Sequence, residues 1–169
     1  MSFDLSSPDT ENLFLKWTKG NKDASRLLVQ FAHWARLVDD MVDEDINDVQ
    51  THISRILELS LIYIPGNSFF LQHQQAIQAV IMEMVIYWKL GDQFRKSENE
   101  KTQMFGFVHR ESTDRLVAVV ASLCGGMEWG EKCVRELHEL THAQSPETLA
   151  DWLAEETNNG TLRKRAKGS

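Results

Sequence analysis

Residues 31–44 read FAHWARLVDDMVDE, and this stretch joins an apolar helical pattern to a run of acidic side chains. Six acidic residues lie within the ten positions from Asp39 to Asp48, and no basic residue interrupts them. Before and within this run, apolar residues recur every three or four positions, at Leu27, Phe31, Ala35, Val38 and Val42. This spacing is typical of one face of a helix. It predicts a helix that begins between Asn21 and Asp23 and runs through Val42.

The rest of the chain repeats the helical pattern, and no segment alternates apolar and polar residues over a useful length. Three Pro and nine Gly in 169 residues are few for an all-β protein, which needs many turns. We expect an all-α bundle of six or seven helices, with one domain over residues 1–160 and a basic tail, expected to be disordered, at 161–169. The other helices are expected near residues 8–19, 49–64, 68–89, 100–123, 128–142 and 146–157. The 68–89 helix is apolar nearly all round, which predicts a central position, and Gly91 should end or bend it.

The composition is that of a soluble protein, and it limits the partners that we expect. The net charge of −7 argues against nucleic-acid binding. The apolar runs, such as Leu59–Ile64, which Ser60 breaks, are too short to span a bilayer, and the N-terminal residues lack the pattern of a signal peptide. Cys124 and Cys133 are expected to be free thiols. These features favour a cytoplasmic protein, and a homodimer stays open as its assembly.

The acidic end of the 22–42 helix is the first candidate site. A helical wheel with about 100° per residue places Asp39 inside the apolar arc and Asp43 beside it, one turn later. Two carboxylates at this spacing repel each other, and partial burial raises the cost. Arg36 can neutralise one carboxylate, and a divalent cation would neutralise the pair. Mg²⁺ prefers oxygen ligands and often binds one or two carboxylates together with phosphate. The residues thus predict either a magnesium site or a solvated acidic helix end.

The same stretch resembles the first aspartate-rich motif of the isoprenoid synthases. It is similar to the DDxxD helix of trans-prenyl diphosphate synthases, and Arg36 to Glu44 match the R-x-x-D-D-x-x-D-E segment of squalene and phytoene synthases. In those families the motif lies on a bundle helix facing an apolar cavity, and it binds the Mg²⁺ ions that hold the substrate diphosphate. The resemblance implies that Asp39 and Asp43 bind Mg²⁺, with Asp40 as a supporting acid.

The resemblance covers about 15 residues of a chain much shorter than the usual synthase. The nearest candidate for a second aspartate-rich motif is Asp151 with Glu155, which a solvated helix face would equally explain. If the resemblance holds, a diphosphate is the expected ligand. If the protein is a transferase or synthase, this diphosphate carries an isoprenyl chain. Arg110 and Arg115 would bind its phosphate oxygens, unless they form ion pairs with Glu111 or Asp114. The isoprenyl chain would contact apolar residues that otherwise belong to the core, namely Met82, Met84, Trp88, Phe105 and Phe107.

Two other metal chemistries compete with this hypothesis. Residues 138–142 read HELTH and match the HExxH pattern, in which His138 and His142 would bind Zn²⁺ and Glu139 would act as general base. A third ligand is needed, and only Glu155 and Glu156 follow. All-α nucleotide pyrophosphohydrolases instead hold Mg²⁺ on ExxE and ExxD pairs. Glu136 with Glu139 and Glu111 with Asp114 match those pairs loosely.

The non-enzymatic alternative is a helical interaction or assembly protein. Five Trp and six Met in a small bundle can leave an apolar patch for a partner. The expected inward position of Asp39 argues against this alternative, because a scaffold has little use for a partly buried carboxylate.

Overall fold

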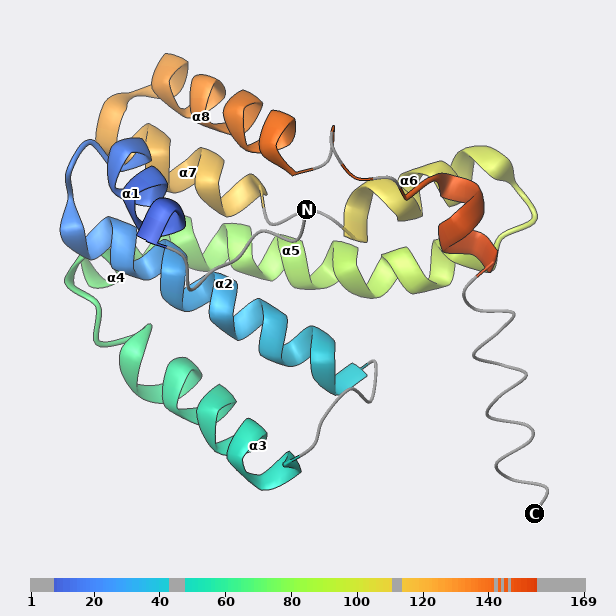
Figure 1. Ribbon diagram of the computed structural model, residues 1–169, viewed down its shortest axis with the longest axis horizontal. Helices are drawn as coiled ribbons and strands as arrows, with labels where there is room; N and C mark the ends of the chain where they lie inside the picture. The colour runs from blue at the N-terminus through green and yellow to red at the C-terminus, as the bar shows by residue number, and fades with distance from the viewer. Residues whose placement is uncertain are drawn as a thin grey trace.

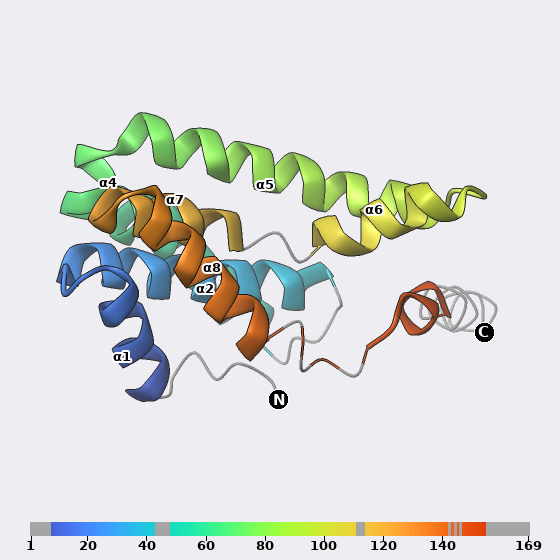
Figure 2. The ribbon, with the colours of Figure 1, turned by 90° about the horizontal axis from the view of Figure 1, so that it is seen from above.

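The computed structural model describes residues 8–42, 48–110, 114–141, 143, 145 and 147–154. Over these residues the chain forms eight α-helices, α1 to α8, and one π-helical turn, η1, with no β-strand. Figure 1 shows the helices as a bundle, and Figure 2 shows α5 along one side of it and α1 on the opposite side. The prediction of an all-α bundle is therefore confirmed. The expected basic tail at 161–169 lies outside the described residues.

The first two helices begin as their sequence signals predict. α1 (Pro8–Trp17) starts at a proline, whose missing N–H costs nothing in the first helical turn. The following turn uses left-handed backbone at Lys19 and Gly20 (φ 54° and 82°). Asn21 then caps α2 (Lys22–Val42), since its Oδ1 accepts hydrogen bonds from the backbone N–H groups of Asp23 and Ala24 (3.1 and 3.0 Å).

The helix predicted over 49–64 consists of α3 (Val49–Glu58) and the π-helical turn η1 (Leu59–Tyr63). Within η1, Ser60 Oγ accepts a hydrogen bond from Trp34 Nε1 of α2 (2.8 Å). This bond fixes η1 against the middle of α2. A π-helical turn adds a residue to a helical turn, and apolar spacing alone does not reveal it.

The helix predicted over 68–89 is broken at His73 into α4 (Ser68–Gln72) and α5 (Gln74–Arg95). Gly91 does not end α5, contrary to one of the two outcomes expected for it. Gly91 instead faces Gly106 of α6 (Glu100–Arg110), the next helix along the chain. A Cβ atom on Gly106 would lie 3.0 Å from the carbonyl oxygen of Gly91. The two glycines therefore let α5 and α6 approach closely.

The described residues of the helix predicted over 100–123 lie in α6 and α7 (Asp114–Gly125), and residues 111–113 between them lie outside the described residues. α8 (Met127–Leu140) then packs along α7, and residues 149–154 form a last helical segment. Figure 1 shows α6 and this segment at the opposite end of the molecule from α1.

The predicted central position of α5 is wrong, because α5 is less buried than α7. α7 buries Leu116, Val117, Val120 and Ala121. α5 buries one face but exposes Met82, Val85 and Ile86, in accord with its place at the side of the bundle in Figure 2. Its pattern is apolar all round because the outer face is also apolar, and the sequence does not distinguish this from central burial.

The interior joins α1, α2, α4, α5, α7 and α8 in one apolar cluster, in which Trp17 is fully buried. Cys124 and Cys133 are free, as predicted. Within the part of the chain that the structure describes, no helix is both long and apolar enough to cross a membrane.

Candidate functional site

The C-terminal end of α2 carries the described part of the aspartate-rich stretch. Arg36 Nε lies 3.0 Å from Asp40 Oδ1, one turn along the helix. The Asp40 side chain is mostly covered, whereas that of Arg36 is largely exposed. Arg36 thus forms an ion pair with Asp40. The negative helix end and the two acidic side chains favour a cation here.

Asp39 is exposed, so the partial burial that its place inside the apolar arc predicted is wrong. The buried side chains of α2 end at Phe31, and the described side chains from Ala32 to Met41 are partly buried or exposed. The apolar arc of the wheel therefore describes the N-terminal half of α2, where other helices cover it. Because Asp39 is not inward, the objection that it raised against an interaction protein no longer holds.

Asp43 lies outside the described residues, together with Glu44 and Asp45. Its predicted metal-binding role remains a prediction. Among the residues that the structure does describe, no group of three or more His, Cys, Asp or Glu side chains could hold a metal ion. Two carboxylates, Asp39 and Asp40, are therefore the described acidic groups of this candidate site.

The last acid of the run, Asp48, has a structural role at the start of α3. Its carboxylate accepts hydrogen bonds from Thr51, from the backbone N–H (3.1 Å) and from Oγ1 (2.7 Å). These bonds lower the pKa of Asp48. Asp48 is an N-cap, which is a common use of aspartate before a helix.

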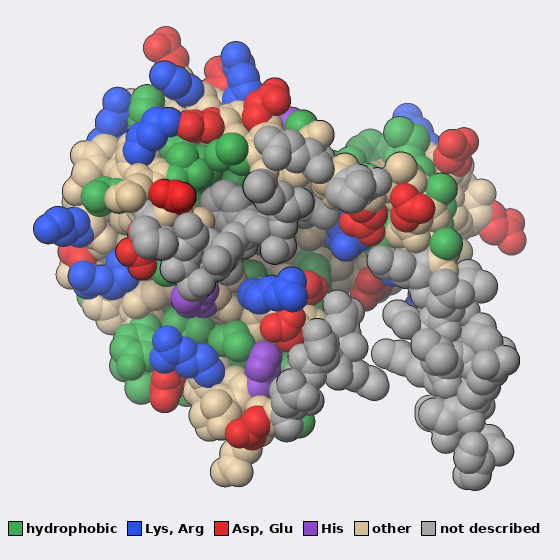
Figure 3. Space-filling model, viewed as in Figure 1, with side chains coloured by type: hydrophobic (Ala, Val, Ile, Leu, Met, Phe, Trp, Pro, Cys, Tyr) green, Lys and Arg blue, Asp and Glu red, His purple; other side chains and the backbone are tan. Residues whose placement is uncertain are grey.

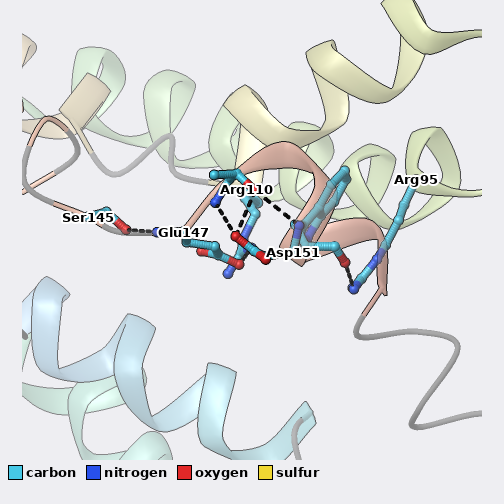
Figure 4. A network of polar contacts seen from close by, with 7 residues as sticks. Arg95, Arg110, Ser145, Glu147 and Asp151 are labelled. Carbon is cyan, nitrogen blue, oxygen red and sulfur yellow. Dashed lines mark hydrogen bonds and ion pairs between the residues drawn. The ribbon is translucent and has the colours of Figure 1, made fainter.

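Arg110, predicted to bind phosphate, is held by the last helical segment. Its Nη1 lies 2.8 Å from Glu147 Oε1, and its guanidinium lies 5.9 Å from the ring centre of Trp152. Arg95 also lies over Trp152 and donates a hydrogen bond to the Trp152 carbonyl oxygen. Figure 4 shows the two arginines approaching this segment from two sides. A phosphate on Arg110 would have to compete with the Glu147 carboxylate.

Arg115, the other predicted phosphate ligand, joins α7 to α5 and α6. Its Nη1 lies 2.5 Å from Glu83 Oε1, and its Nη2 lies 3.2 Å from His109 Nδ1. Its guanidinium also lies 4.5 Å from the ring centre of Tyr87, which lies 4.1 Å from the ring centre of His109. Both arginines thus form ion pairs, as the alternative reading of the sequence expected, but with Glu147 and Glu83. These partners lie far away in sequence, and no sequence signal pointed to them.

His109 makes the stability of the fold depend on pH. Burial and the nearby Arg115 lower the pKa of His109, partly offset by Glu83. The folded chain therefore binds a proton at His109 less readily than the unfolded chain does. The contribution of neutral His109 to the stability of the fold is complete above the ordinary pKa of 6.5 and is lost as the pH falls below it. We expect a lower melting temperature at about pH 5.5 than at about pH 7.5.

The variant that tests this expectation is His109→Asn. Its side-chain oxygen keeps a hydrogen-bond acceptor near the position of Nδ1, and asparagine does not titrate between these pH values. At neutral pH we expect this variant to melt at a lower temperature than the wild type, because the ring contact with Tyr87 is lost. Between the two pH values it should lose less stability than the wild type does. An equal loss in both proteins would assign the pH dependence to other groups.

The zinc pattern is only partly described. His138 and Glu139 lie on the exposed side of α8, and His142 lies outside the described residues. Glu136, of the candidate ExxE pair, binds Lys16 Nζ (2.5 Å) and Trp17 Nε1 (2.9 Å). These hydrogen bonds lower its pKa despite partial burial. Glu136 thus links α8 to α1. Glu111, of the other candidate pair, lies outside the described residues.

The candidate second motif is also only half described. Asp151 accepts hydrogen bonds from the backbone N–H and Oγ1 of Thr148 (2.9 and 2.6 Å), and these lower its pKa. Asp151 thus stabilises the turn that begins the last helical segment. Glu155 lies outside the described residues.

An open groove of about 600 Å³ lies beside α8. Its walls carry four acidic and three basic side chains: Lys16, Glu128, Glu131, Lys132, Arg135, Glu136 and Glu139. Lys16 is paired with Glu136 and Arg135 with Glu131. Because its charges are mixed in sign and two of its three basic side chains are paired with carboxylates, this groove offers little attraction for a diphosphate.

Comparisons with protein-family models, with curated proteins and with solved structures find no match to this chain. The resemblance to the isoprenoid synthases therefore rests on residues 31–44 alone.

Proposed function

We propose that this protein binds Mg²⁺ together with a diphosphate at the C-terminal end of α2. The observation that carries the proposal is the position of Asp39. Its carboxylate is exposed near the end of a helix, beside an Asp40 that Arg36 already neutralises. Ligands can therefore reach Asp39 without displacing the apolar core.

The residues fit Mg²⁺ only together with a second ligand. Mg²⁺ is often bound through one or two carboxylates, with water and phosphate oxygens as its remaining ligands. Asp39, supported by Asp40, supplies that number of carboxylates, and the helix end adds the field of its free carbonyl groups. Bound Mg²⁺ would offset the charge of a diphosphate and make it a better leaving group. Binding of Mg²⁺ alone should be weak, and diphosphate should strengthen it.

An isoprenyl diphosphate is the organic ligand that the resemblance implies. Its chain would need an apolar cavity, and the residues expected to contact it do not share one face. Met84 is buried in the core, whereas Met82 of the same helix and Phe105 of α6 are exposed. Phe107 packs against Trp152. The proposal is therefore limited to diphosphate binding, and isoprenyl transfer is a finer hypothesis for which no chain-binding cavity is described.

Calorimetric titration of diphosphate, with and without Mg²⁺, tests the proposal. We expect Mg²⁺-dependent binding to the wild type and at least about tenfold weaker binding to Asp39→Asn, which removes one negative ligand without changing shape. The matched control is Asp92→Asn, because Asp92 is also an exposed helical aspartate but lies on α5. It should bind as the wild type does.

Two results would overturn the proposal. One is a wild type that binds no diphosphate in the presence of Mg²⁺. The other is an equal loss in Asp39→Asn and Asp92→Asn, which would indicate a general effect of negative charge. Thermal melting of both variants shows whether they are folded.

A further inference from the structure

The last helical segment, residues 149–154, is fixed to the bundle by one buried side chain. Trp152 is 3% exposed, whereas the other described residues from 143 to 154 are exposed or partly buried. Trp152 does not belong to the main apolar cluster of the bundle. It packs instead at the end of the molecule that α6 forms with the last turns of α5, which Figure 3 shows as a smaller lobe beside the main body. The segment therefore has a binding site of its own.

Four residues of α5 and α6 contact the indole ring, and we call them the Trp152 site. Gly106 lets the ring approach the backbone of α6, because a Cβ atom there would lie 3.0 Å from Trp152 Cη2. The ring centre of Phe107 lies 5.7 Å from that of Trp152. The guanidiniums of Arg95 and Arg110 lie 4.8 and 5.9 Å from the centre of the indole ring. Aromatic and cation–π contacts thus hold a tryptophan here.

The charges of the segment complement those of the site. The last eight described residues contain two acidic side chains, Glu147 and Asp151, and no basic one. Glu147 Oε1 lies 2.8 Å from Arg110 Nη1 in a partly buried ion pair. The Trp152 carbonyl oxygen accepts a hydrogen bond from Arg95, and Figure 4 shows both arginines directed at the segment. The site thus recognises an indole ring together with a carboxylate five positions before it.

We propose that the Trp152 site is a peptide-binding site which residues 147–154 occupy from within the chain, and that a partner protein displaces them with an acidic helical segment of the same chemistry. A helix of six residues is too short to be stable in water by itself, so the segment depends on this site. Tryptophan and arginine supply most of the affinity at many protein interfaces, and here they are its main contacts. Because the main apolar cluster does not include Trp152, the segment can leave while that cluster stays closed. The proposal is independent of diphosphate binding, because it does not involve Asp39.

A fluorescent peptide with the sequence of residues 145–154 tests the site on the full-length chain. The wild type should bind this peptide only at millimolar concentration, because its own segment competes as a tethered ligand. The full-length Trp152→Ala variant should bind it at least about tenfold more tightly, as measured by fluorescence anisotropy. A peptide with alanine in place of its tryptophan should not bind. Equal affinity of the two proteins for the peptide, or of the variant for the two peptides, would overturn the proposal.

A charge exchange tests the ion pair. Arg110→Glu, added to Trp152→Ala, should weaken peptide binding at least about tenfold, and a peptide with Glu147→Arg should restore it. The matched control is Lys101→Glu, since Lys101 is an exposed basic residue of α6, about 180° around the helix from Arg110. It should leave peptide binding unchanged. An equal loss in the two charge variants, or no restoration by the altered peptide, would contradict the proposal.

A measurement on the unaltered chain covers the case in which circular dichroism shows that Trp152→Ala does not fold. Unlabelled peptide is added to ¹⁵N-labelled wild type at several millimolar, where it competes with the tethered segment. The amide signals of residues 149–154 should move as the segment leaves its site, while those of α1, at the opposite end of the molecule, stay in place. Signals of residues 149–154 that do not move would show that the segment is a fixed part of the fold.

Discussion

Replacing Trp17 with alanine should lower the free energy of unfolding by about 3–5 kcal/mol. Trp17 is fully buried in the main apolar cluster. Its ring packs against Phe14, and its Nε1 donates to Glu136 on α8 (2.9 Å). Trp129 of α8 in turn donates to the Trp17 carbonyl oxygen (2.7 Å). The substitution would leave a large cavity and remove one of the hydrogen-bond donors to the Glu136 carboxylate.

Urea denaturation measures this change. A loss of this size is a large share of the stability of a typical domain, about 5–15 kcal/mol. The control is Met82→Ala, which removes an exposed side chain and should change the free energy by no more than about 0.5 kcal/mol. A Trp17→Ala protein as stable as this control would show that α1 does not pack on α8 as described.

The second large effect is expected at the crossing of α5 and α6, where two neighbouring glycines should respond in opposite directions. A Cβ atom on Gly106 would lie 2.9 Å from Phe94 Cβ and 3.0 Å from both the Gly91 carbonyl oxygen and the Trp152 ring. Gly106→Ala should therefore cost about 1–3 kcal/mol through overpacking. A Cβ atom on Gly91 would meet the Gly106 carbonyl oxygen at 3.4 Å, an ordinary contact.

Gly91→Ala should be neutral or should stabilise the protein by up to about 1 kcal/mol, because alanine favours the helix more than glycine does. Melting temperatures of the two variants, measured side by side, give the comparison. The packing of α6 on α5 would be in doubt if Gly106→Ala were the more stable of the two.

These helices also show which features of the fold could be predicted from the sequence alone. α2 was predicted closely because its start and its apolar spacing are local properties, and Asn21 caps it as such a residue should. The break at His73 interrupts no apolar pattern, so it could not be predicted. Gly91 was interpreted as a helix end or bend, whereas its packing role depends on Gly106 of a different helix.

In the candidate site, too, local contacts could be predicted from the sequence and long-range contacts could not. The Arg36–Asp40 ion pair is a contact between neighbouring turns, and the sequence did place Arg36 beside these acids. The burial of Asp39 was mispredicted because it depends on which helices cover the end of α2. Glu147 lies 37 positions from Arg110, and Glu83 lies 32 positions from Arg115. Partners this distant are set by the packing of the bundle.

Paramagnetic mapping tests directly whether Mg²⁺ and a diphosphate bind at the C-terminal end of α2. Mn²⁺, which prefers similar oxygen ligands, is added with diphosphate to ¹⁵N-labelled protein, and the broadening of each amide signal is recorded. We predict the strongest broadening around Asp39 and Asp40, with the signals of His138 and Glu139 on α8 unchanged. Broadening centred on α8, or none that depends on diphosphate, would contradict the claim.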